Sequence, residues 1–183
     1  MNARALRLFI TIPAAGDICR AVANLVEQLR AAGADYKWVD PGNLHLTVRF
    51  FGETPVERLP EIAALMKQAA ASPAFELAFS GLGAFGSWQE PRVLWIGVSR
   101  GAAELAAVAA ALGPAEEGRP FAAHLTVGRM RSGRGRDRLR AVADKVVFPE
   151  MRQQADRLVL FESRLTAGGP IYEIRAEQDF SER

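Results

Sequence analysis

The tetrapeptide His-Leu-Thr-Val occurs twice in this chain, at residues 45–48 and 124–127, and the two copies contain both of its histidines. Histidine has an ordinary pKa near neutrality, so it is the usual side chain for moving protons in catalysis. In a β-strand the first and third residues of a tetrapeptide face one side, and the second and fourth face the other. Each copy is therefore predicted to be a strand with His and Thr on one face and Leu and Val in the core.

Two such strands lying side by side would gather two imidazoles and two hydroxyls on one face of a sheet. One imidazole can then act as general base and the other as general acid, while the hydroxyls donate hydrogen bonds to anionic oxygens. A single histidine in an apolar strand is more often a structural residue than a catalytic one. Because both histidines stand in the same tetrapeptide, we favour the catalytic interpretation.

The composition is that of an ordinary globular protein. The chain has 183 residues, of which 49% are hydrophobic, and this is enough to bury a core in one unit spanning 1–183. The net charge of +2 says little about partners. Cys19 is the only cysteine, which excludes an intrachain disulfide and favours a reducing, cytoplasmic location. The usual Cys and His ligands of zinc are too few, so no metal or cofactor is predicted, and no apolar run is long enough to span a membrane.

Hydrophobic periodicity predicts alternating strands and helices. The strands are expected at 6–12, 44–51, 75–79, 92–98, 121–128, 155–162 and 171–176, with a short extended piece around Trp38. The helices are expected at 18–33, 54–72, 102–112 and 135–146. Thr54, Pro55 and Glu57 have the pattern of a capping box at a helix start. The order is compatible with two similar halves, each containing one motif strand, and no linker separates them. The prediction is a single bilobal α+β unit.

Further stretches, taken with the doubled motif, resemble the two-histidine phosphoesterase superfamily. Within it the chain is most similar to the bacterial and archaeal RNA 2′,3′-cyclic phosphodiesterases, historically called 2′-5′ RNA ligases. The matching stretches are 7–10, 43–53, 91–98, 124–129, 160–165 and 169–172, in the family's order. One departure is Ala123, where the family commonly has proline. The resemblance implies a fold of two pseudo-symmetric antiparallel-sheet lobes with outer helices and a central cleft.

The resemblance also implies an activity. It is metal-independent hydrolysis of a 2′,3′-cyclic phosphate at an RNA end to a 2′-phosphate, with reverse ligation that needs no ATP. By the family pattern His45 is the general acid and His124 the general base, although their local sequences are equivalent. Thr47 and Thr126 would donate hydrogen bonds to the phosphoryl oxygens. By the same resemblance Arg129 would stabilise the developing negative charge.

Arg129 raises a geometric difficulty. It lies five residues after His124, so strict strand alternation places its side chain on the opposite face. Gly128 stands directly before it, and a glycine there permits a bulge or turn that would redirect the arginine.

Substrate contacts are predicted in two places. The segment 129–140 contains six arginines and one acid, so it either guides RNA phosphates or forms a solvated face; Arg131 and Arg134 are its candidates for binding. Phe51 shares the face of His45 by strand parity, and Phe51 and Tyr172 are predicted to stack on bases. The expected partner is RNA with a cyclic phosphate end, and the chain is expected to act as a monomer.

Two other functions are compatible with the sequence. One is a phosphodiesterase for small nucleotides, such as nucleoside or ADP-ribose cyclic phosphates or 2′-5′ oligonucleotides. The other is a noncatalytic RNA-binding module, although the presence of both histidines and both threonines argues against it.

Overall fold

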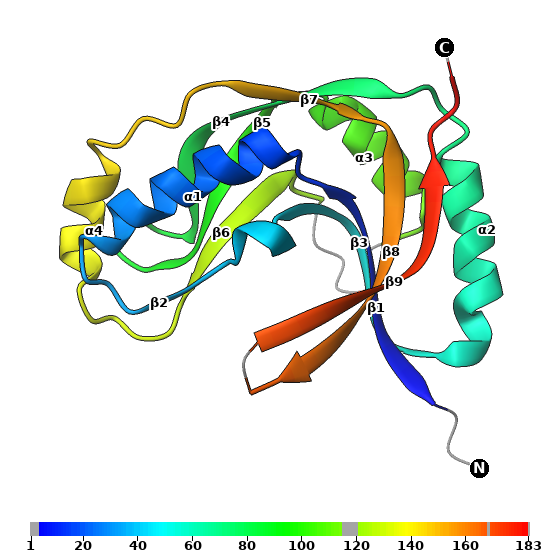
Figure 1. The fold of residues 1–183 in the computed structure, drawn as a ribbon, viewed down its shortest axis with the longest axis horizontal. Coiled ribbons are helices and arrows are strands. Elements are labelled where there is room, and N and C mark those ends of the chain that lie inside the picture. The colour runs from blue at the N-terminus through cyan, green and yellow to red at the C-terminus, as the bar shows by residue number, and fades with distance from the viewer. Residues whose placement is uncertain (1–3, 115–120, 168, 183) are drawn as a thin grey trace.

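The computed structural model of the chain describes residues 4–114, 121–167 and 169–182. In these ranges it contains four α-helices and nine strands (Figure 1). The strands are β1 (Ala5–Pro13), β2 (Tyr36–Trp38), β3 (His45–Pro55), β4 (Phe75–Gly86), β5 (Pro91–Arg100), β6 (His124–Met130), β7 (Met151–Ala155), β8 (Arg157–Thr166) and β9 (Gly169–Asp179). The helices are α1 (Gly16–Arg30), α2 (Leu59–Ala69), α3 (Ala102–Ala111) and α4 (Arg136–Ala143), with short 3₁₀ turns at Pro41–Asn43 and Val56–Arg58.

The strands form one curled sheet in the order β7-β4-β5-β6-β3-β1-β8-β9, and β2 pairs separately with β6. All of the strand pairs are antiparallel. The two motif strands, β3 and β6, are neighbours at the centre, where Leu46 opposite Leu125 is their single paired position. The sheet thus has two four-stranded halves that meet at the two motifs, which confirms the predicted α+β fold class.

The halves of the sheet do not coincide with the halves of the chain, which corrects the simplest interpretation of the repeat. The C-terminal strands β8 and β9 extend the half that begins with β3 and β1, whereas β4, from the first half of the chain, lies beside β5 and β7. The predicted strand at 155–162 corresponds to β8, which pairs with β1, whereas the short strand β7 before it was not predicted and pairs with β4. Long-range pairing decides this arrangement, and local periodicity does not encode it.

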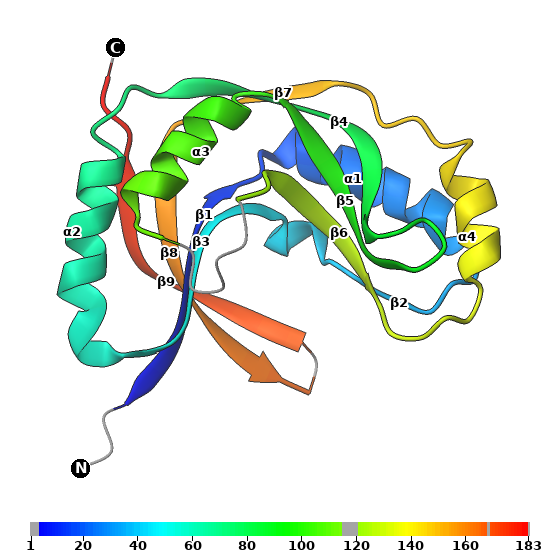
Figure 2. The same ribbon diagram turned by 180° about the vertical axis from the view of Figure 1, so that it is seen from behind.

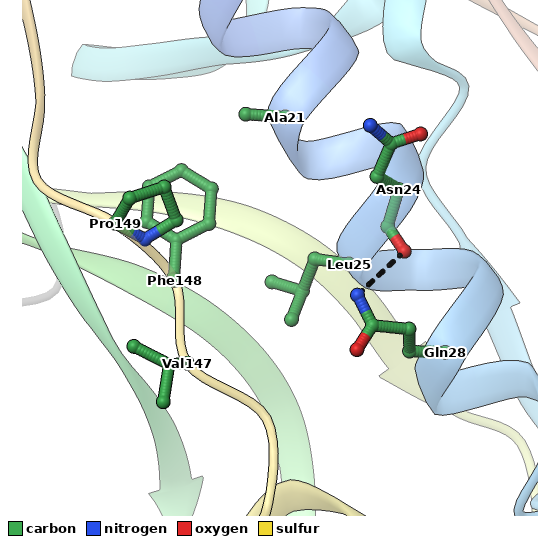
Figure 3. Close-up of a pocket in the computed structure, with 7 residues that line it drawn as sticks. All are labelled: Ala21, Asn24, Leu25, Gln28, Val147, Phe148 and Pro149. Carbon is green, nitrogen blue, oxygen red and sulfur yellow. Dashed lines mark hydrogen bonds between the residues drawn. The ribbon is translucent and has the colours of Figure 1, made fainter.

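Each half of the sheet is covered by two helices. Helices α1 and α4 lie against the β4–β5–β6 half, and α2 and α3 lie beside the other (Figures 1 and 2). The predicted apolar stripe of α1 is buried, and its members are Ile18, Val22, Leu25, Val26 and Leu29. A small hollow of about 160 Å³ remains between α1 and the segment Val147–Pro149 (Figure 3). None of the helices in the described ranges is long and apolar enough to cross a membrane.

The predicted capping box at Thr54 is wrong. Strand β3 continues to Pro55, because β1 pairs with it as far as Ala5 opposite Pro55. Thr54 is buried in this strand, and its hydroxyl donates to the carbonyl of Gly52 at 3.2 Å instead of capping a helix. A 3₁₀ turn follows, and α2 begins only at Leu59. Pairing with β1 therefore outweighs the local capping preference.

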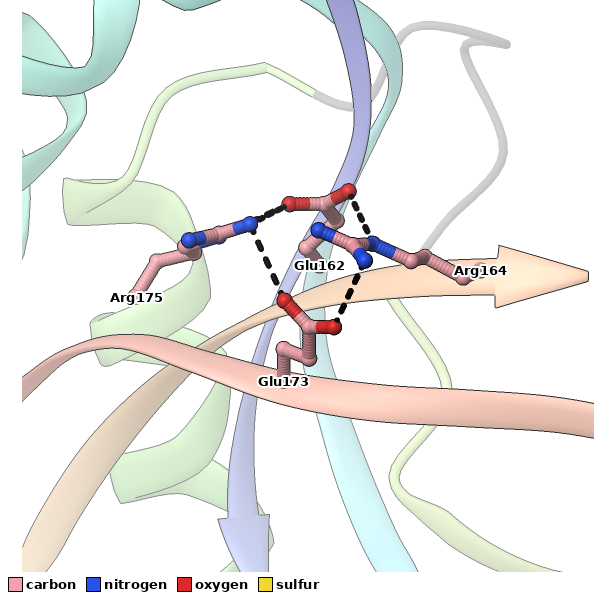
Figure 4. A network of polar contacts seen from close by, with 4 residues as sticks. All are labelled: Glu162, Arg164, Glu173 and Arg175. Atoms are coloured by element: carbon pink, nitrogen blue, oxygen red, sulfur yellow. Dashed lines mark hydrogen bonds and ion pairs between the residues drawn. The ribbon is translucent and has the colours of Figure 1, made fainter.

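Four charged side chains tie β8 to β9 (Figure 4). By strand alternation they lie on the face of the hairpin opposite to Tyr172, whose ring contacts His45. Glu162 and Glu173 are directly opposite each other, and Arg164 and Arg175 each bridge both carboxylates. Burial by itself raises the pKa of Glu162, but hydrogen bonds from Arg175 and Arg164 outweigh it and leave the pKa below its ordinary value. The hairpin, which also carries Tyr172, is held together by this ring of ion pairs.

The ring makes Glu162 important for stability. We expect Glu162→Gln to lower the free energy of unfolding by about 2 kcal/mol, because two arginines lose the charge they share. Since the pKa of Glu162 is lowered on folding, this stabilisation is complete at neutral pH and is lost as the pH falls below about 4. Urea denaturation from pH 7 to pH 3 measures both effects.

The matched control is Glu177→Gln, which removes an exposed pair with Arg157. We expect a change below about 0.5 kcal/mol from this control. Equal effects of the two substitutions would contradict the special role of Glu162.

Candidate active site

The two motif strands have the predicted alternation. The four Leu and Val side chains of the motifs are buried, and the His and Thr side chains are half-buried. Because Leu46 and Leu125 are opposite each other in an antiparallel pair, the adjacent positions place His45 beside Thr126 and Thr47 beside His124. Two sequence-distant tetrapeptides therefore present their four polar side chains together on one face of the sheet.

Both imidazoles are held in the same way. The Nδ1 of His45 lies 2.7 Å from the carbonyl oxygen of Asn43, and the Nδ1 of His124 lies 2.7 Å from that of Ala122. A carbonyl only accepts hydrogen bonds, so each Nδ1 carries a proton and donates it. Each Nε2 is left for chemistry: it accepts a proton when the ring is neutral and donates one when the ring is charged.

The side chain of Arg129 returns to the face of the histidines through a bulge in β6. The register of β5 against β6 pairs Trp95 with Thr126, Leu94 with Gly128 and Val93 with Arg129. Val127 has no partner in this register, so the alternation changes by one residue. Arg129 is thereby on the same face as His124, as the glycine before it was expected to permit.

The positive charge of Arg129 affects the pKa values of both histidines and of Tyr172. Burial is the main cause that lowers the pKa of His45 and of His124, and the nearby Arg129 guanidinium lowers both further. The charge of His124 also lowers the pKa of His45, because two imidazolium ions close together repel each other. Burial raises the pKa of Tyr172, although Arg129 opposes it. At neutral pH both histidines are thus mainly uncharged beside one permanent cation.

Aromatic rings flank each histidine. His45 contacts Phe9 and Tyr172, with ring centroids at 5.2 and 5.5 Å. His124 contacts Phe85 edge to face at 4.7 Å. Tyr172 therefore lies beside His45, and its stacking on a base stays a prediction. Phe85 was missed, because only the pairing of β4 with β5 brings its strand to His124.

The predicted role of Phe51 is wrong. Its side chain is 4% exposed and belongs to the core, whereas Phe50 is 43% exposed. Strand β1 pairs Thr11 with Thr47 and Ile10 with Arg49, so Val48 is unpaired and the alternation changes by one residue before Phe50, which is opposite Phe9. Phe51 is consequently unable to stack on a base.

The arginine-rich segment divides into parts with different surroundings. Arg131 and Arg134 are exposed in the turn after β6, so their predicted binding role stays a prediction. On α4, Arg140 pairs with Asp144 at 2.9 Å and lies over the Trp88 ring, beside a hollow of about 580 Å³. That hollow is away from the histidines. Among the described residues, no group of three or more His, Cys, Asp and Glu side chains is placed to hold a metal ion.

Two imidazoles hydrogen-bonded through Nδ1, two threonines and one arginine on a shared sheet face are the groups that an acid–base site of a phosphoesterase requires. The comparisons agree with this class. The sequence model of the family described as LigT like Phosphoesterase matches residues 12–95. An RNA 2′,3′-cyclic phosphodiesterase of Thermotoga maritima is 30% identical over 96% of both chains. Another, from Archaeoglobus fulgidus, is 34% identical over 91% of this chain and 96% of its own. The chain belongs to this family of LigT-like phosphoesterases and is an enzyme.

Solved structures confirm the fold. The protein TT0787 of Thermus thermophilus is 26% identical, with a TM-score of 0.72 over 97% of this chain and 99% of its own. Escherichia coli LigT in its apo form is 22% identical, with a TM-score of 0.74 and the same coverage. Because Escherichia coli LigT is only 22% identical to this chain, its similarity is evidence for the fold alone.

The two histidines make the electrostatics directly measurable, since NMR has only two imidazoles to resolve. We expect both pKa values below 6.5. Arg129→Gln should raise both values, because a nearby positive charge disfavours the imidazolium. Arg157→Gln, at the exposed start of β8, is the control and should change neither. If Arg129→Gln left both histidine pKa values unchanged, the Arg129 guanidinium would not lie close to the imidazoles.

Proposed function

We propose that this enzyme hydrolyses the 2′,3′-cyclic phosphate at an RNA end to a 2′-phosphate, without a metal ion. The observation that carries the proposal is the pair of imidazoles, fixed in the same tautomer on adjacent strands with Arg129 in reach of both. The relatives at 30% identity and above, which are named RNA 2′,3′-cyclic phosphodiesterases, support the choice of substrate.

The chemistry follows from the positions of these groups. One Nε2 removes a proton from water, whose oxygen forms a bond to phosphorus. The bond from phosphorus to the 3′-oxygen breaks, and the other Nε2 donates a proton to that oxygen. Arg129 and the hydroxyls of Thr47 and Thr126 donate hydrogen bonds to the nonbridging oxygens, where negative charge accumulates. The product is a 2′-phosphate with a free 3′-hydroxyl. When the 5′-hydroxyl of another RNA end takes the place of water, its oxygen bonds to phosphorus, the bond to the 3′-oxygen breaks, and the same groups form a 2′-5′ linkage without ATP.

We assign His45 as the acid and His124 as the base by the resemblance. In the free protein the pKa of each imidazole is lowered, so the assignment requires the bound substrate to favour the charged form of His45. A phosphate anion beside both rings raises both pKa values, and it favours the imidazolium that lies nearer to it. The proton must therefore be on His45 when the 3′-oxygen leaves.

The basic test is turnover of an RNA oligomer with a 2′,3′-cyclic phosphate end in the presence of EDTA. We expect conversion to the 2′-phosphate by the wild type and a loss of about 10²–10⁴-fold in His45→Ala and in His124→Ala. Circular dichroism checks that the variants are folded. Turnover within tenfold of wild type in either variant would contradict the two-histidine mechanism. Turnover of nucleoside cyclic phosphates alone would favour the small-nucleotide function.

A substrate with sulfur at the bridging 3′ position separates the two roles. A thiolate leaves without being protonated, so the general acid becomes unnecessary for this substrate. We expect His45→Ala to come within about tenfold of wild type on the sulfur substrate, while His124→Ala remains strongly impaired. The opposite pattern in measured kcat would reverse the assignment.

A further inference from the structure

Lys37 is fixed on the same face of the sheet as Arg129. In the short strand β2 it is directly opposite Arg129 of β6. Its neighbours Tyr36 and Trp38 stack on each other at 5.2 Å on the other face, against Gly128. A Cβ at Gly128 would lie 2.8 Å from the Trp38 ring, so glycine is needed for this close packing. Strand alternation then directs Lys37 toward the side of the histidines.

Strand β2 is anchored as well as paired. The Tyr36 hydroxyl donates to the carbonyl oxygen of Pro91 in β5, and the amide of Val39 donates to the carbonyl of Val127 at 3.0 Å. Burial raises the pKa of Tyr36 to about 12, so this hydroxyl keeps its proton. The strand that carries Lys37 is thus held by hydrogen bonds to both β5 and β6.

The ammonium group of Lys37 reaches across to the other half of the sheet. A Cβ at Gly169 would lie 3.8 Å from its Nζ, and Gly169 is the first residue of β9. The same hairpin carries Tyr172, whose ring contacts His45. The end of the hairpin and β2 lie on the same side of the molecule in both views (Figures 1 and 2). Lys37 is therefore at the rim of the site, between Arg129 and the hairpin.

The positive charges of Lys37 and Arg129 do not stabilise the folded protein. Like charges at directly opposite positions of a sheet are destabilising. In the described part of the chain, the ion pairs between side chains include neither Lys37 nor Arg129. Lys37 and Arg129 are therefore two adjacent cations that no carboxylate in the described residues neutralises. Such a pair favours a ligand with two negatively charged phosphates.

We propose that Lys37 binds the phosphate that joins the terminal nucleotide to the rest of the RNA, while Arg129 acts at the cyclic phosphate. The inference rests on the proposed function. Opposite residues of an antiparallel pair have Cβ atoms about 5 Å apart, so their long side chains can reach neighbouring phosphates of one strand. Lys37 then makes the enzyme prefer a nucleotide with a 5′-phosphate or an RNA end over a bare nucleoside cyclic phosphate.

The test compares three substrates. They are adenosine 2′,3′-cyclic phosphate, its 5′-phosphorylated form, and the dinucleotide ApA with a 2′,3′-cyclic phosphate end. We expect Lys37→Met to lower kcat/KM about five- to tenfold for the second and third, as for loss of one lysine–phosphate contact, and less than about twofold for the first. The salt dependence of kcat/KM for the dinucleotide should weaken by about 0.7 in log–log slope. Lys37→Arg should retain most of the preference.

Lys67→Met, on the outer helix α2, is the matched control and should change none of these values. An equal loss on all three substrates, or no loss, would overturn the proposal. So would a loss on the dinucleotide alone, because the 5′-phosphorylated nucleotide has the same phosphate. If the wild type converts none of them, the proposed function fails. Binding of ApA with a 2′-phosphate end, which needs no turnover, then decides the role of Lys37: equal affinity for wild type and Lys37→Met would overturn it.

Discussion

The site depends on one interaction, the antiparallel pairing of β3 with β6 at Leu46 and Leu125. The two side chains are almost completely buried, so the hydrophobic core fixes the position of the pair. One residue away on either side are the two histidines and the two threonines. A shift of this register by one residue would turn the polar side chains toward the core, because side chains of a strand alternate between faces. The core residues of the motifs thereby determine the geometry of the polar ones.

Around this pair the two halves of the sheet contribute matched but unequal parts. Each half supplies one histidine whose Nδ1–H is held by the carbonyl two residues before it, and each supplies aromatic contacts for that ring. Only the β6 half supplies Arg129, through the bulge at Val127. One cation near two equivalent imidazoles lowers both pKa values. Arg129 is thus the unequal contribution of the two halves to a site whose histidines are held in the same way.

β-Bulges explain why the side-chain directions expected from strand alternation were correct for some residues and wrong for others. For Arg129 the sequence contained a signal, since a glycine precedes it, and the side chain was correctly expected to be redirected. In β3 no such signal precedes the bulge. Strand alternation therefore predicted that Phe51 faces the histidines and Phe50 the core, whereas Phe50 is exposed and Phe51 is buried. The capping box at Thr54 failed for a related reason, because pairing with β1 extends β3 through the expected helix start. Local patterns are reliable until a neighbouring strand imposes a different register.

The sequence by itself determined the chemical groups, the alternation of the two motif strands and the family, because these depend on residue identity and short-range spacing. Tertiary structure alone decided which strands are neighbours. It brought β8 and β9 beside β1, placed Tyr172 at His45 and Phe85 at His124, and set Lys37 opposite Arg129. These contacts join residues that are far apart in the chain. They are selected by burial and hydrogen bonding across the whole sheet, which no local pattern records.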